Sequence, residues 1–369
     1  MSKYIHLLKN WPEFTWDHEK LVHPLATVRH QQGRLLGKLE GLGFQLQSEA
    51  SLGNLILDVM KSSEIEGEEL PMDQVRSSIA RKLGMKVPGL VVASRDVDGV
   101  VEMMLDATQK HAKPLTKERL FAWHGALFPT GRSGLHKIQV AAWRDAEGDP
   151  MQVVSGAMGK ERVHFEAPEA ARLEHEMKIF LKWFNQSEEL DSLLKAAIAH
   201  LWFVTIHPFD DGNGRIARAI ADMQLSRSDQ SSQRFYSMSA QIQQERKMYY
   251  DCLEKTQRGT LDITGWLLWF LNCFGRALSA STNNVASVMN KATFWEKNRT
   301  VALNDRQRKM LNKLMGGLEG KLTSSKWAKM TKSSPDTALR DIQSLIQSKM
   351  LEKEEGGGRS TSYKIKYLA

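Results

Sequence analysis

Apolar side chains recur at helical spacing along most of this chain, and this periodicity constrains its fold more than any other feature. The most apolar stretch, 196–206, carries His200 and is shorter than the roughly 20 residues that cross a membrane, so a buried helix is expected there. The chain is therefore predicted to be mainly α. Two helix faces show the pattern most clearly: Leu52, Leu55, Ile56, Val59 and Met60, and Leu193, Leu194, Ala197, Ile198 and Leu201.

Two short segments depart from the helical pattern and predict β-hairpins. Residues 151–165 place a Ser-Gly turn between two runs rich in β-branched and aromatic side chains. Residues 353–367 place three glycines between two segments of alternating polar and apolar residues. Each is expected to form a small two-stranded hairpin.

Composition and charge narrow the class of protein. The chain has 369 residues, of which 41% are hydrophobic and 25% charged, so a folded globular protein of two or three domains is expected. Its two cysteines have no spacing typical of a zinc site or a disulfide framework. The first ten residues do not predict a secretory leader, so the cytosol is the expected compartment and no membrane is expected as a partner. Residues 301–369 carry +7 of the net +8 and form a separate basic module.

Residues 207–218, HPFDDGNGRIAR, hold the densest group of reactive side chains. They lie between the apolar helix and the next helix. Gly212 and Gly214 let the backbone turn and present amide hydrogens where a helix begins, which favours an anion. Arg215 and Arg218, three residues apart on that helix, share a face and suit successive phosphates. The segment predicts a polyphosphate site.

Two further groups in the segment suggest chemistry on that polyphosphate. Asp211 is a carboxylate of the kind that holds Mg²⁺ together with phosphate oxygens. His207, at the end of the apolar helix, is a candidate general base. Taken singly, each residue has a plain alternative, since a histidine on an apolar helix is usually structural and an arginine pair usually faces solvent. Together within twelve residues they favour a catalytic site.

The segment resembles the signature of the Fic family, HxFx(D/E)GNGRxxR, at every position. This resemblance implies a helical enzyme that transfers AMP from Mg-ATP to a Ser, Thr or Tyr hydroxyl of a protein, and some members modify themselves. It implies that His207 takes the hydroxyl proton and Asp211 holds Mg²⁺. Phe209 would anchor the loop in the core. The resemblance assigns the α- and β-phosphates to Gly212, Asn213, Gly214 and Arg215, and the γ-phosphate to Arg218.

Other parts of the chain are similar to further features of the family. Gly214 replaces the lysine of the Doc-like kinases, which favours AMP transfer. The hairpin 151–165 resembles the flap, whose edge pairs with the target segment; the alternative is a plain surface hairpin. His124 is expected in the core or the pocket wall. Glu245, where relatives often carry Asn, and Tyr249 are the candidates for the adenosine side.

Residues 62–67, SSEIEG, match the (S/T)xxxE(G/N) pattern of the inhibitory helix of Fic proteins. The resemblance gives Ser62, Glu66 and Gly67 an inhibitory role. A carboxylate at Glu66 that faces Arg218 would occupy the arginine meant for the γ-phosphate. The alternative is a solvated acidic face.

The basic module resembles a winged helix-turn-helix, with helices expected at 323–330 and 336–349 before the glycine-rich hairpin. In that fold the second helix usually enters the major groove of DNA and the wing meets phosphate. Thr337, Arg340, Arg359 and Lys364 would then face DNA. The alternative is a protein-binding or dimer-stabilising module.

The expected organisation follows from these segments. An N-terminal helical regulatory domain takes 1–110, the Fic catalytic core 111–280, a linker helix 281–300, and the winged helix-turn-helix 301–369. The expected function is autoinhibited AMP transfer to protein hydroxyls, with ATP and an unknown target protein as partners and a homodimer implied by the family. The rival hypotheses are a DNA-binding regulator whose Fic core senses a nucleotide, and transfer of another nucleotide such as UMP.

Overall fold

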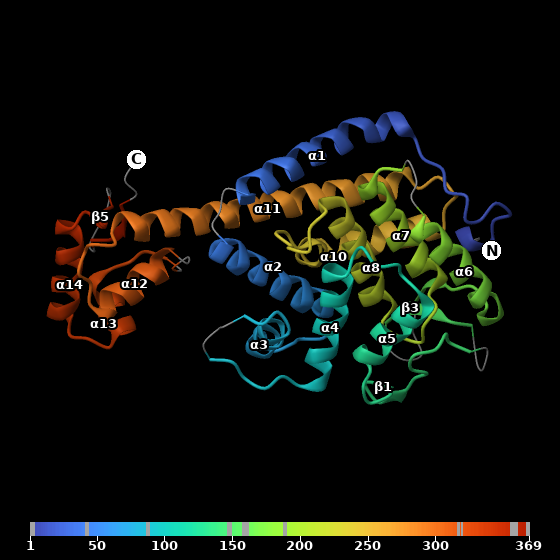
Figure 1. Cartoon of the computed structure of the whole chain (residues 1–369), viewed down its shortest axis with the longest axis horizontal. Helices are drawn as coiled ribbons and strands as arrows, with labels where there is room; N and C mark the ends of the chain where they lie inside the picture. Colours follow the sequence, from blue (N-terminus) through green and yellow to red (C-terminus); the bar gives the residue numbers. More distant parts are fainter. Residues whose placement is uncertain are drawn as a thin grey trace. The chain divides into compact units, whose positions relative to one another are not determined.

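The computed structural model divides the chain into two compact units, 1–282 and 283–369. It describes residues 4–40, 44–85, 89–145, 150–156, 162–186, 190–315, 318, 320–354 and 361–366. Helices make up most of both units, and the strands form only two-stranded antiparallel pairs among these residues (Figure 1). The prediction of a mainly α fold is confirmed.

The first unit begins with a short 3₁₀ turn, η1, and four helices. Helix α1 runs beside α11 (Figure 1), where a Cβ on Gly275 would lie 3.4 Å from Val28. Helix α2 ends at the segment with the inhibitory-type motif. The bounds are η1 Ile5–Leu7, α1 His18–Glu40, α2 Phe44–Ile65, α3 Met72–Lys82 and α4 Arg95–Gln109.

The remaining elements include the two helices that flank the 207–218 segment, and the last of them, α11, continues past residue 282 into the second unit. They are α5 Lys117–Leu127, β1 Arg132–Ser133, β2 His136–Lys137, β3 Gln152–Ser155, β4 Arg162–Glu166, η2 Ala170–Arg172, α6 Leu173–Asn185, α7 Ser192–Ile206, α8 Asn213–Asp229, α9 Met238–Gln244, α10 Arg246–Gln257 and α11 Thr264–Lys297. Helix α11 is continuous, so the residues expected as a separate linker helix, 281–300, belong mostly to a helix that begins at Thr264. The first half of α11 is buried through its apolar face. The polar composition of the second half did not indicate that both halves belong to one helix.

Helices α7 and α8 pack against each other at the centre of the first unit. Every residue of α7 from Leu193 to Ile206 is buried, as expected of a helix that is apolar on all sides. The Asp191 side chain caps α7 by accepting a hydrogen bond from the Leu193 amide at 2.8 Å. The segment 207–212 joins this buried helix to α8, so its geometry is fixed at both ends.

The predicted hairpin at 151–165 is present as β3 and β4. Val153 pairs with Phe165 and Val154 with Val163, with a register shift between the two pairs. Phe165 is buried and packs with Tyr4 and Ala167, which fixes β4 to the body of the unit. β3 lies on the outside.

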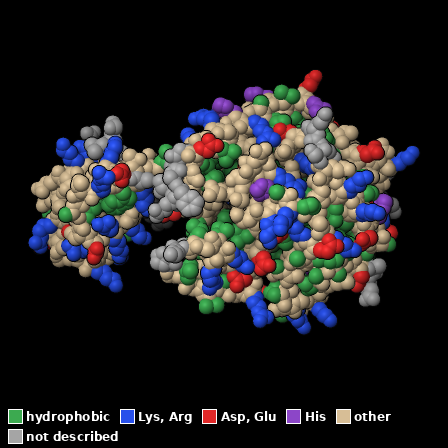
Figure 2. All heavy atoms as spheres, in the orientation of Figure 1, with side chains coloured by type: hydrophobic (Ala, Val, Ile, Leu, Met, Phe, Trp, Pro, Cys, Tyr) green, Lys and Arg blue, Asp and Glu red, His purple; other side chains and the backbone are tan. Residues whose placement is uncertain are grey.

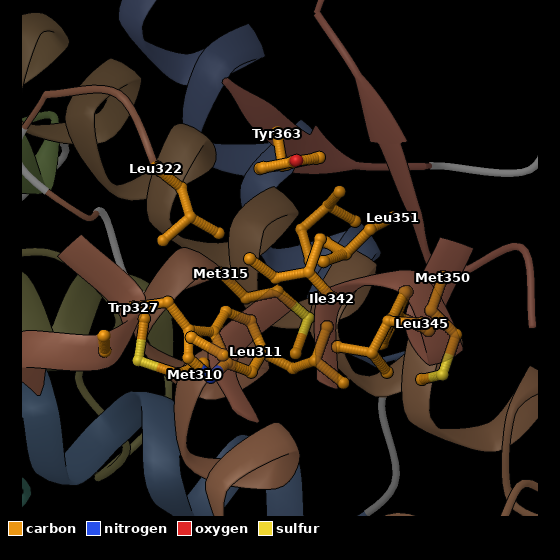
Figure 3. Close-up of a cluster of buried hydrophobic side chains, with 14 residues drawn as sticks. Met310, Leu311, Met315, Leu322, Trp327, Ile342, Leu345, Met350, Leu351 and Tyr363 are labelled. Carbon is orange, nitrogen blue, oxygen red and sulfur yellow. The ribbon is translucent and has the colours of Figure 1, made fainter. Parts of the chain in front are cut away.

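After the end of α11, the described residues of the second unit form three helices and one hairpin: α12 Asp305–Met315, α13 Ser324–Thr331, α14 Pro335–Gln347, β5 Leu351–Lys353 and β6 Tyr363–Ile365. Trp327, Leu311 and Ile342 lie at the centre of its own core (Figure 3). Lys and Arg side chains are spread over its surface (Figure 2). The two predicted helices and the two strands lie close to their expected positions.

None of the helices in the described parts of the chain has an apolar run of the length that a bilayer crossing requires.

We expect Gly99→Ala to destabilise the first unit strongly. A Cβ at this buried position of α4 would lie 1.8 Å from the Ala126 carbonyl oxygen of α5, so the two helices would have to separate at a cost of about 1–3 kcal/mol or more. Thermal unfolding should show a lower midpoint. The matched control is Gly53→Ala, which meets no atom within 4 Å on an exposed helix position and should gain about 0.5–1 kcal/mol. Equal midpoints for the two variants would contradict this packing.

Candidate active site

The loop between α7 and α8 turns at two residues with left-handed backbone angles. His207 ends α7 with φ +51°, and Gly212 precedes α8 with φ +78°. A Cβ on Gly212 would lie 2.9 Å from the Phe128 ring, so glycine is required by both the angle and the close approach. The Asn213 side chain closes the loop, since its Oδ1 accepts from the Phe209 amide at 3.0 Å and its Nδ2 donates to the Phe209 carbonyl at 2.7 Å. Only the main chain of Asn213 is left to face an anion.

Phe209 and His124 hold this loop against the core. Their rings stack with centroids 4.2 Å apart, and both side chains are fully buried. His124 Nδ1 accepts from the Ala141 amide at 3.1 Å, so its Nε2 carries the proton and donates to the Asp211 carbonyl at 3.2 Å. His124 is therefore a positioning residue, consistent with the expected place in the core.

Arg144 is a second support that the sequence reasoning missed. Its Nε donates to the His207 carbonyl at 2.9 Å, and its amide donates to the Pro208 carbonyl at 2.9 Å. The side chain is buried. A single arginine in the segment between α5 and the flap gives no signal of this role, because its partners are main-chain atoms far away in the sequence.

The His207 imidazole faces a cavity with one nitrogen free of protein partners in the described structure. Nδ1 lies 3.2 Å from the Val204 carbonyl, which places the proton on Nδ1 and leaves the lone pair on Nε2. Burial lowers the pKa of His207 to about 4, with a smaller contribution from the charge of Arg144 and against the Val204 hydrogen bond, which raises it. The imidazole is therefore neutral at neutral pH, the form that a general base requires.

The first turn of α8 is occupied by the carboxylate of Glu66, the residue just after α2. A Cβ on Gly214 would lie 2.2 Å from Glu66 Oε1, so the absence of a side chain at Gly214 makes room for that oxygen. The same oxygen accepts from Arg218 Nη2 at 2.8 Å. The predicted anion cradle thus holds an anion from within the chain.

Arg218 is buried and bound mostly to the inhibitory-type motif. Its Nε donates to Ser62 Oγ at 3.0 Å and its Nη2 to the Ser62 carbonyl at 2.8 Å. Gly67, with φ +87°, follows the end of α2 and directs the chain away after Glu66. Arg218 Nη1 is buried without a partner among the described atoms, which leaves a donor for a further anion oxygen.

Glu68 provides a second carboxylate for the cradle. Its Oε2 lies 2.6 Å from Arg215 Nη1, and the Arg215 side chain is only 3% exposed. Sequence reasoning treated the acidic run 64–69 as a possible solvated face and selected Glu66 alone. The position of Glu68 two residues after Glu66 in that run was the signal that could have identified it.

A buried ionic cluster around Asp58 fixes α2 on α8. Asp58 lies one helical turn before Ser62 and two turns before Glu66. Asp58 of α2 and Asp222 of α8 are both buried, with Arg234 between them. Arg234 Nη2 lies 2.6 Å from Asp222 Oδ1 and 3.9 Å from Asp58 Oδ2, and Ser237 Oγ donates to Asp58 at 2.6 Å. Burial, followed by the charge of Asp222, raises the pKa of Asp58 above its usual range. This cluster sets the register that brings Glu66 to Arg218.

The cavity beside His207 and Gly214 measures about 740 Å³, a size that suits a nucleotide-sized ligand. Tyr249 lines it and is held by a 2.9 Å contact between its hydroxyl and His200 Nε2. Arg246 and Tyr250 also line it, and sequence reasoning missed both. The Glu245 carboxylate is instead paired with Arg276 of α11 at 2.5 Å, so the structure assigns it to a salt bridge.

Asp211 fits a magnesium ion bound mainly through phosphate oxygens. Its Oδ2 accepts from Ser133 Oγ and its Oδ1 from the Gly212 amide at 2.6 Å, so the carboxylate is oriented at the mouth of the cradle. The described residues include no cluster of three or more acidic, histidine or cysteine side chains that could form a closed metal site. A lone oriented carboxylate is the donor set that Mg²⁺ uses with a nucleotide.

The residues proposed to face DNA lie on two elements of the second unit. Thr337 and Arg340 are on α14, with Arg340 exposed, and Lys364 is exposed on β6, 3.3 Å from Glu352. Arg359 lies outside the described residues. DNA binding stays a prediction.

Residues 114–225 match the model of the Fic/DOC family. The chain carries a Fic/DOC family domain. The Fic domain runs from just before α5 to α8 and includes the whole 207–218 segment. A second model, a domain of unknown function (DUF4172), matches residues 4–85, which contain Ser62, Glu66 and Gly67.

Several curated relatives of the Fic domain are named protein adenylyltransferase. The protein from Caenorhabditis elegans is 26% identical over 174 residues, covering 47% of this chain and 32% of the relative. The protein from Nematostella vectensis is 24% identical, and the match covers 60% of this chain and 47% of the relative. The protein from Drosophila grimshawi is 34% identical over 104 residues, and the match covers 28% of this chain and 20% of the relative. The chain thus spans half or less of the length of these relatives.

Two solved structures share the fold around the Fic domain. A Fic family protein from Desulfovibrio desulfuricans aligns with a TM-score of 0.55 at 21% identity, covering 97% of this chain and 99% of that one. A Fic domain containing signaling protein from Bacteroides thetaiotaomicron aligns with a TM-score of 0.52 at 20% identity, and the alignment covers 70% of this chain and 97% of that one. The predicted Fic-type helical fold is confirmed.

A buried histidine of the Fic domain should make stability depend on pH. Burial, followed by the charge of Arg218, lowers the pKa of His200 to about 3. Below pH 6.5 the unfolded chain therefore binds a proton that the folded chain excludes. The contribution of His200 to the free energy of unfolding decreases as the pH is lowered. The raised pKa of Asp58 acts in the opposite direction, so the comparison is with His200→Gln. Urea unfolding should show the difference between wild type and variant shrinking by about 2 kcal/mol from pH 7 to pH 5.

The control for this experiment is Val22→Ala, a change between two uncharged side chains at an exposed position of α1. Its difference from the wild type should not change with pH. A constant difference for His200→Gln would contradict the neutral, buried state of that imidazole.

Proposed function

We propose that the chain transfers AMP from ATP to Ser, Thr or Tyr hydroxyls of a target protein, and that Glu66 holds this activity back. The observation that carries the proposal is one cavity that joins a free imidazole nitrogen on His207 to Gly214 and to the Glu66 carboxylate, which occupies Arg218. The relatives named protein adenylyltransferase support the choice of AMP transfer.

In the proposed reaction, His207 Nε2 takes the proton of the target hydroxyl as its oxygen attacks the α-phosphorus. The main-chain amides at the start of α8 and the Arg215 guanidinium hold the α- and β-phosphates. Arg218, whose Nη1 is free in the described structure, holds the γ-phosphate. These donors are fixed by the loop before the nucleotide enters, so they stabilise developing charge without having to rearrange.

Asp211 would hold Mg²⁺, which when bound supplies positive charge to the phosphate oxygens. Ser133 and the Gly212 amide keep the Asp211 carboxylate in place for this role. A change at Ser133 would therefore act through the orientation of Asp211.

β3 would bind the target segment. Among the described residues β3 pairs only with β4, so its other edge has free main-chain donors and acceptors. Strand addition at such an edge positions a side chain through main-chain contacts, whatever the sequence of the target. Val153 and Val154 line the cavity, so a target strand added there would lie beside His207.

The inhibition would act through charge and space. Glu66 Oε1 lies where a phosphate oxygen on Arg218 would lie, so a bound triphosphate and the carboxylate repel each other. The productive position of the α-phosphate then requires Glu66 to leave. Ser62 and the cluster of Asp58, Asp222 and Arg234 favour the inhibited arrangement by holding α2 on α8.

Removal of the Glu66 side chain should release the activity. We expect Glu66→Gly, incubated with α-labelled ATP, Mg²⁺ and a cell lysate, to label lysate proteins at least tenfold more than the wild type. The double variant Glu66→Gly with His207→Ala should lose this label by about 10²–10⁴-fold, the usual contribution of a general base. Gel autoradiography measures both.

The matched control is Glu64→Gln in the same acidic run. Glu64 pairs with Lys61 at 2.7 Å, so this variant should remain inhibited. If Glu66→Gly binds ATP and leaves every protein unlabelled, AMP transfer is not the function of the site.

Glu68→Gln should test the second carboxylate. Because Glu68 is 48% exposed, its ion pair with Arg215 contributes about 0.2–1 kcal/mol, so loss of its charge should tighten ATP binding up to about fivefold. Calorimetric titration in the His207→Ala background measures the affinity without turnover. An unchanged dissociation constant would show that Glu68 does not compete with the nucleotide.

A further inference from the structure

A second hydroxyl, imidazole and carboxylate lie in line on the wall of the His207 cavity. Ser155 Oγ of β3 lies 2.6 Å from His164 Nε2 of β4, and His164 Nδ1 lies 2.6 Å from Glu254 Oε2 of α10. All three residues line the cavity that also contains Gly214. The reaction proposed above uses none of them.

The hydrogen bonds assign the protons in this set. A carboxylate beside His164 Nδ1 keeps the proton on that nitrogen, so Nε2 accepts from the Ser155 hydroxyl. Burial raises the pKa of Glu254, but the hydrogen bonds from His164 and Arg162 outweigh it and leave the pKa below its usual value. Glu254 is therefore ionised at neutral pH. This is the order in which proteins activate a hydroxyl: nucleophile, base, and a third group that orients the base.

The hairpin is fixed to α10 at this point. Arg258 donates to the carbonyl of Val163 at 2.6 Å and to the carbonyl of His164 at 2.9 Å, and Arg162 Nη2 lies 2.9 Å from Glu254 Oε1. The base is thus held by main-chain and side-chain contacts. Ser155 itself is exposed at the end of β3, so its oxygen is open to an electrophile in the cavity.

We propose that Ser155 is an acceptor of the nucleotidyl group within its own chain, with His164 as the base for this hydroxyl and Glu254 as the residue that orients it. This rests on the proposed transfer from ATP. Ser155 Oγ forms a bond to the α-phosphorus, and the bond from the α-phosphorus to the bridging oxygen of the β-phosphate breaks. Its electron pair leaves with diphosphate. The hydroxyl proton passes to His164 Nε2, and Glu254 stabilises the imidazolium.

The product would be a phosphodiester on Ser155 at the edge where the target strand is proposed to bind. Its negative charge and its bulk would lie on the cavity wall. Self-modification at this position would therefore compete with the transfer to a target protein, which is a property that an acceptor elsewhere on the surface would lack.

The test uses the full-length Glu66→Gly chain, purified and incubated alone with ATP and Mg²⁺, followed by tryptic digestion and mass spectrometry. Ser155 is the only residue with a hydroxyl in the tryptic peptide 145–160, so an adenylyl group on this peptide is assigned without ambiguity. We expect the adduct in Glu66→Gly, its loss in Ser155→Ala and its return in Ser155→Thr. The modified fraction should grow at a rate that is independent of protein concentration.

His164→Gln separates the role of the base from the mere presence of the acceptor. Glutamine retains a hydrogen bond to Ser155 but takes no proton, so we expect the rate of Ser155 modification to fall at least tenfold. The thermal unfolding midpoint of this variant should be close to that of Glu66→Gly, which shows that the loss of rate does not come from loss of the fold.

Each contrary outcome has a separate meaning. Labelled lysate proteins with an unmodified 145–160 peptide overturn the acceptor role of Ser155 and leave the proposed AMP transfer standing. Absence of label on every protein overturns both. A full rate in His164→Gln overturns the role of His164, and a rate proportional to protein concentration overturns transfer within one chain.

Discussion

The buried guanidinium of Arg218 is the constraint around which the rest of the site is arranged. A charge that is 2% exposed lowers stability by several kcal/mol unless it is paired. In this structure the partners are the Ser62 hydroxyl and carbonyl from α2 and the Glu66 carboxylate just after its end. The same arginine is the one that the proposed reaction assigns to the γ-phosphate. Pairing within the chain and pairing with a nucleotide are therefore alternatives for one group.

The polar surface between α2 and α8 determines which carboxylate of the chain reaches Arg218. Asp58 and Ser62 are four residues apart on one face of α2, and Glu66 follows four residues later, just past the end of the helix. Arg218 and Asp222 have the same spacing on α8. Such a surface has few satisfactory registers, because a shift by one turn would leave buried charges unpaired. The Glu66 carboxylate thus reaches the cradle through contacts made two turns earlier.

Much of the active-site loop was predictable from local sequence. Gly212 requires a left-handed angle and a close approach, the arginines of 207–218 share a helix face, and α7 is apolar on every side. These are properties of neighbouring residues and follow from backbone sterics and helical periodicity. The supports of the loop were not predictable in this way. Arg144 binds carbonyl groups, which every residue has, so no sequence pattern identifies its partners.

The sequence by itself determined the helical class, the hairpin at 151–165, the phosphate-cradle chemistry of 207–218 and the presence of an acidic motif before it. Only the tertiary structure decided which acidic groups meet which arginines: Glu66 with Arg218, Glu68 with Arg215, and Glu245 with Arg276. It also decided that the Asn213 amide closes the loop and that Ser155, His164 and Glu254 form one chain of hydrogen bonds. The physical reason is that periodicity and turn geometry act over a few residues. Hydrogen bonds and ion pairs depend on distances that packing sets between residues far apart in the chain.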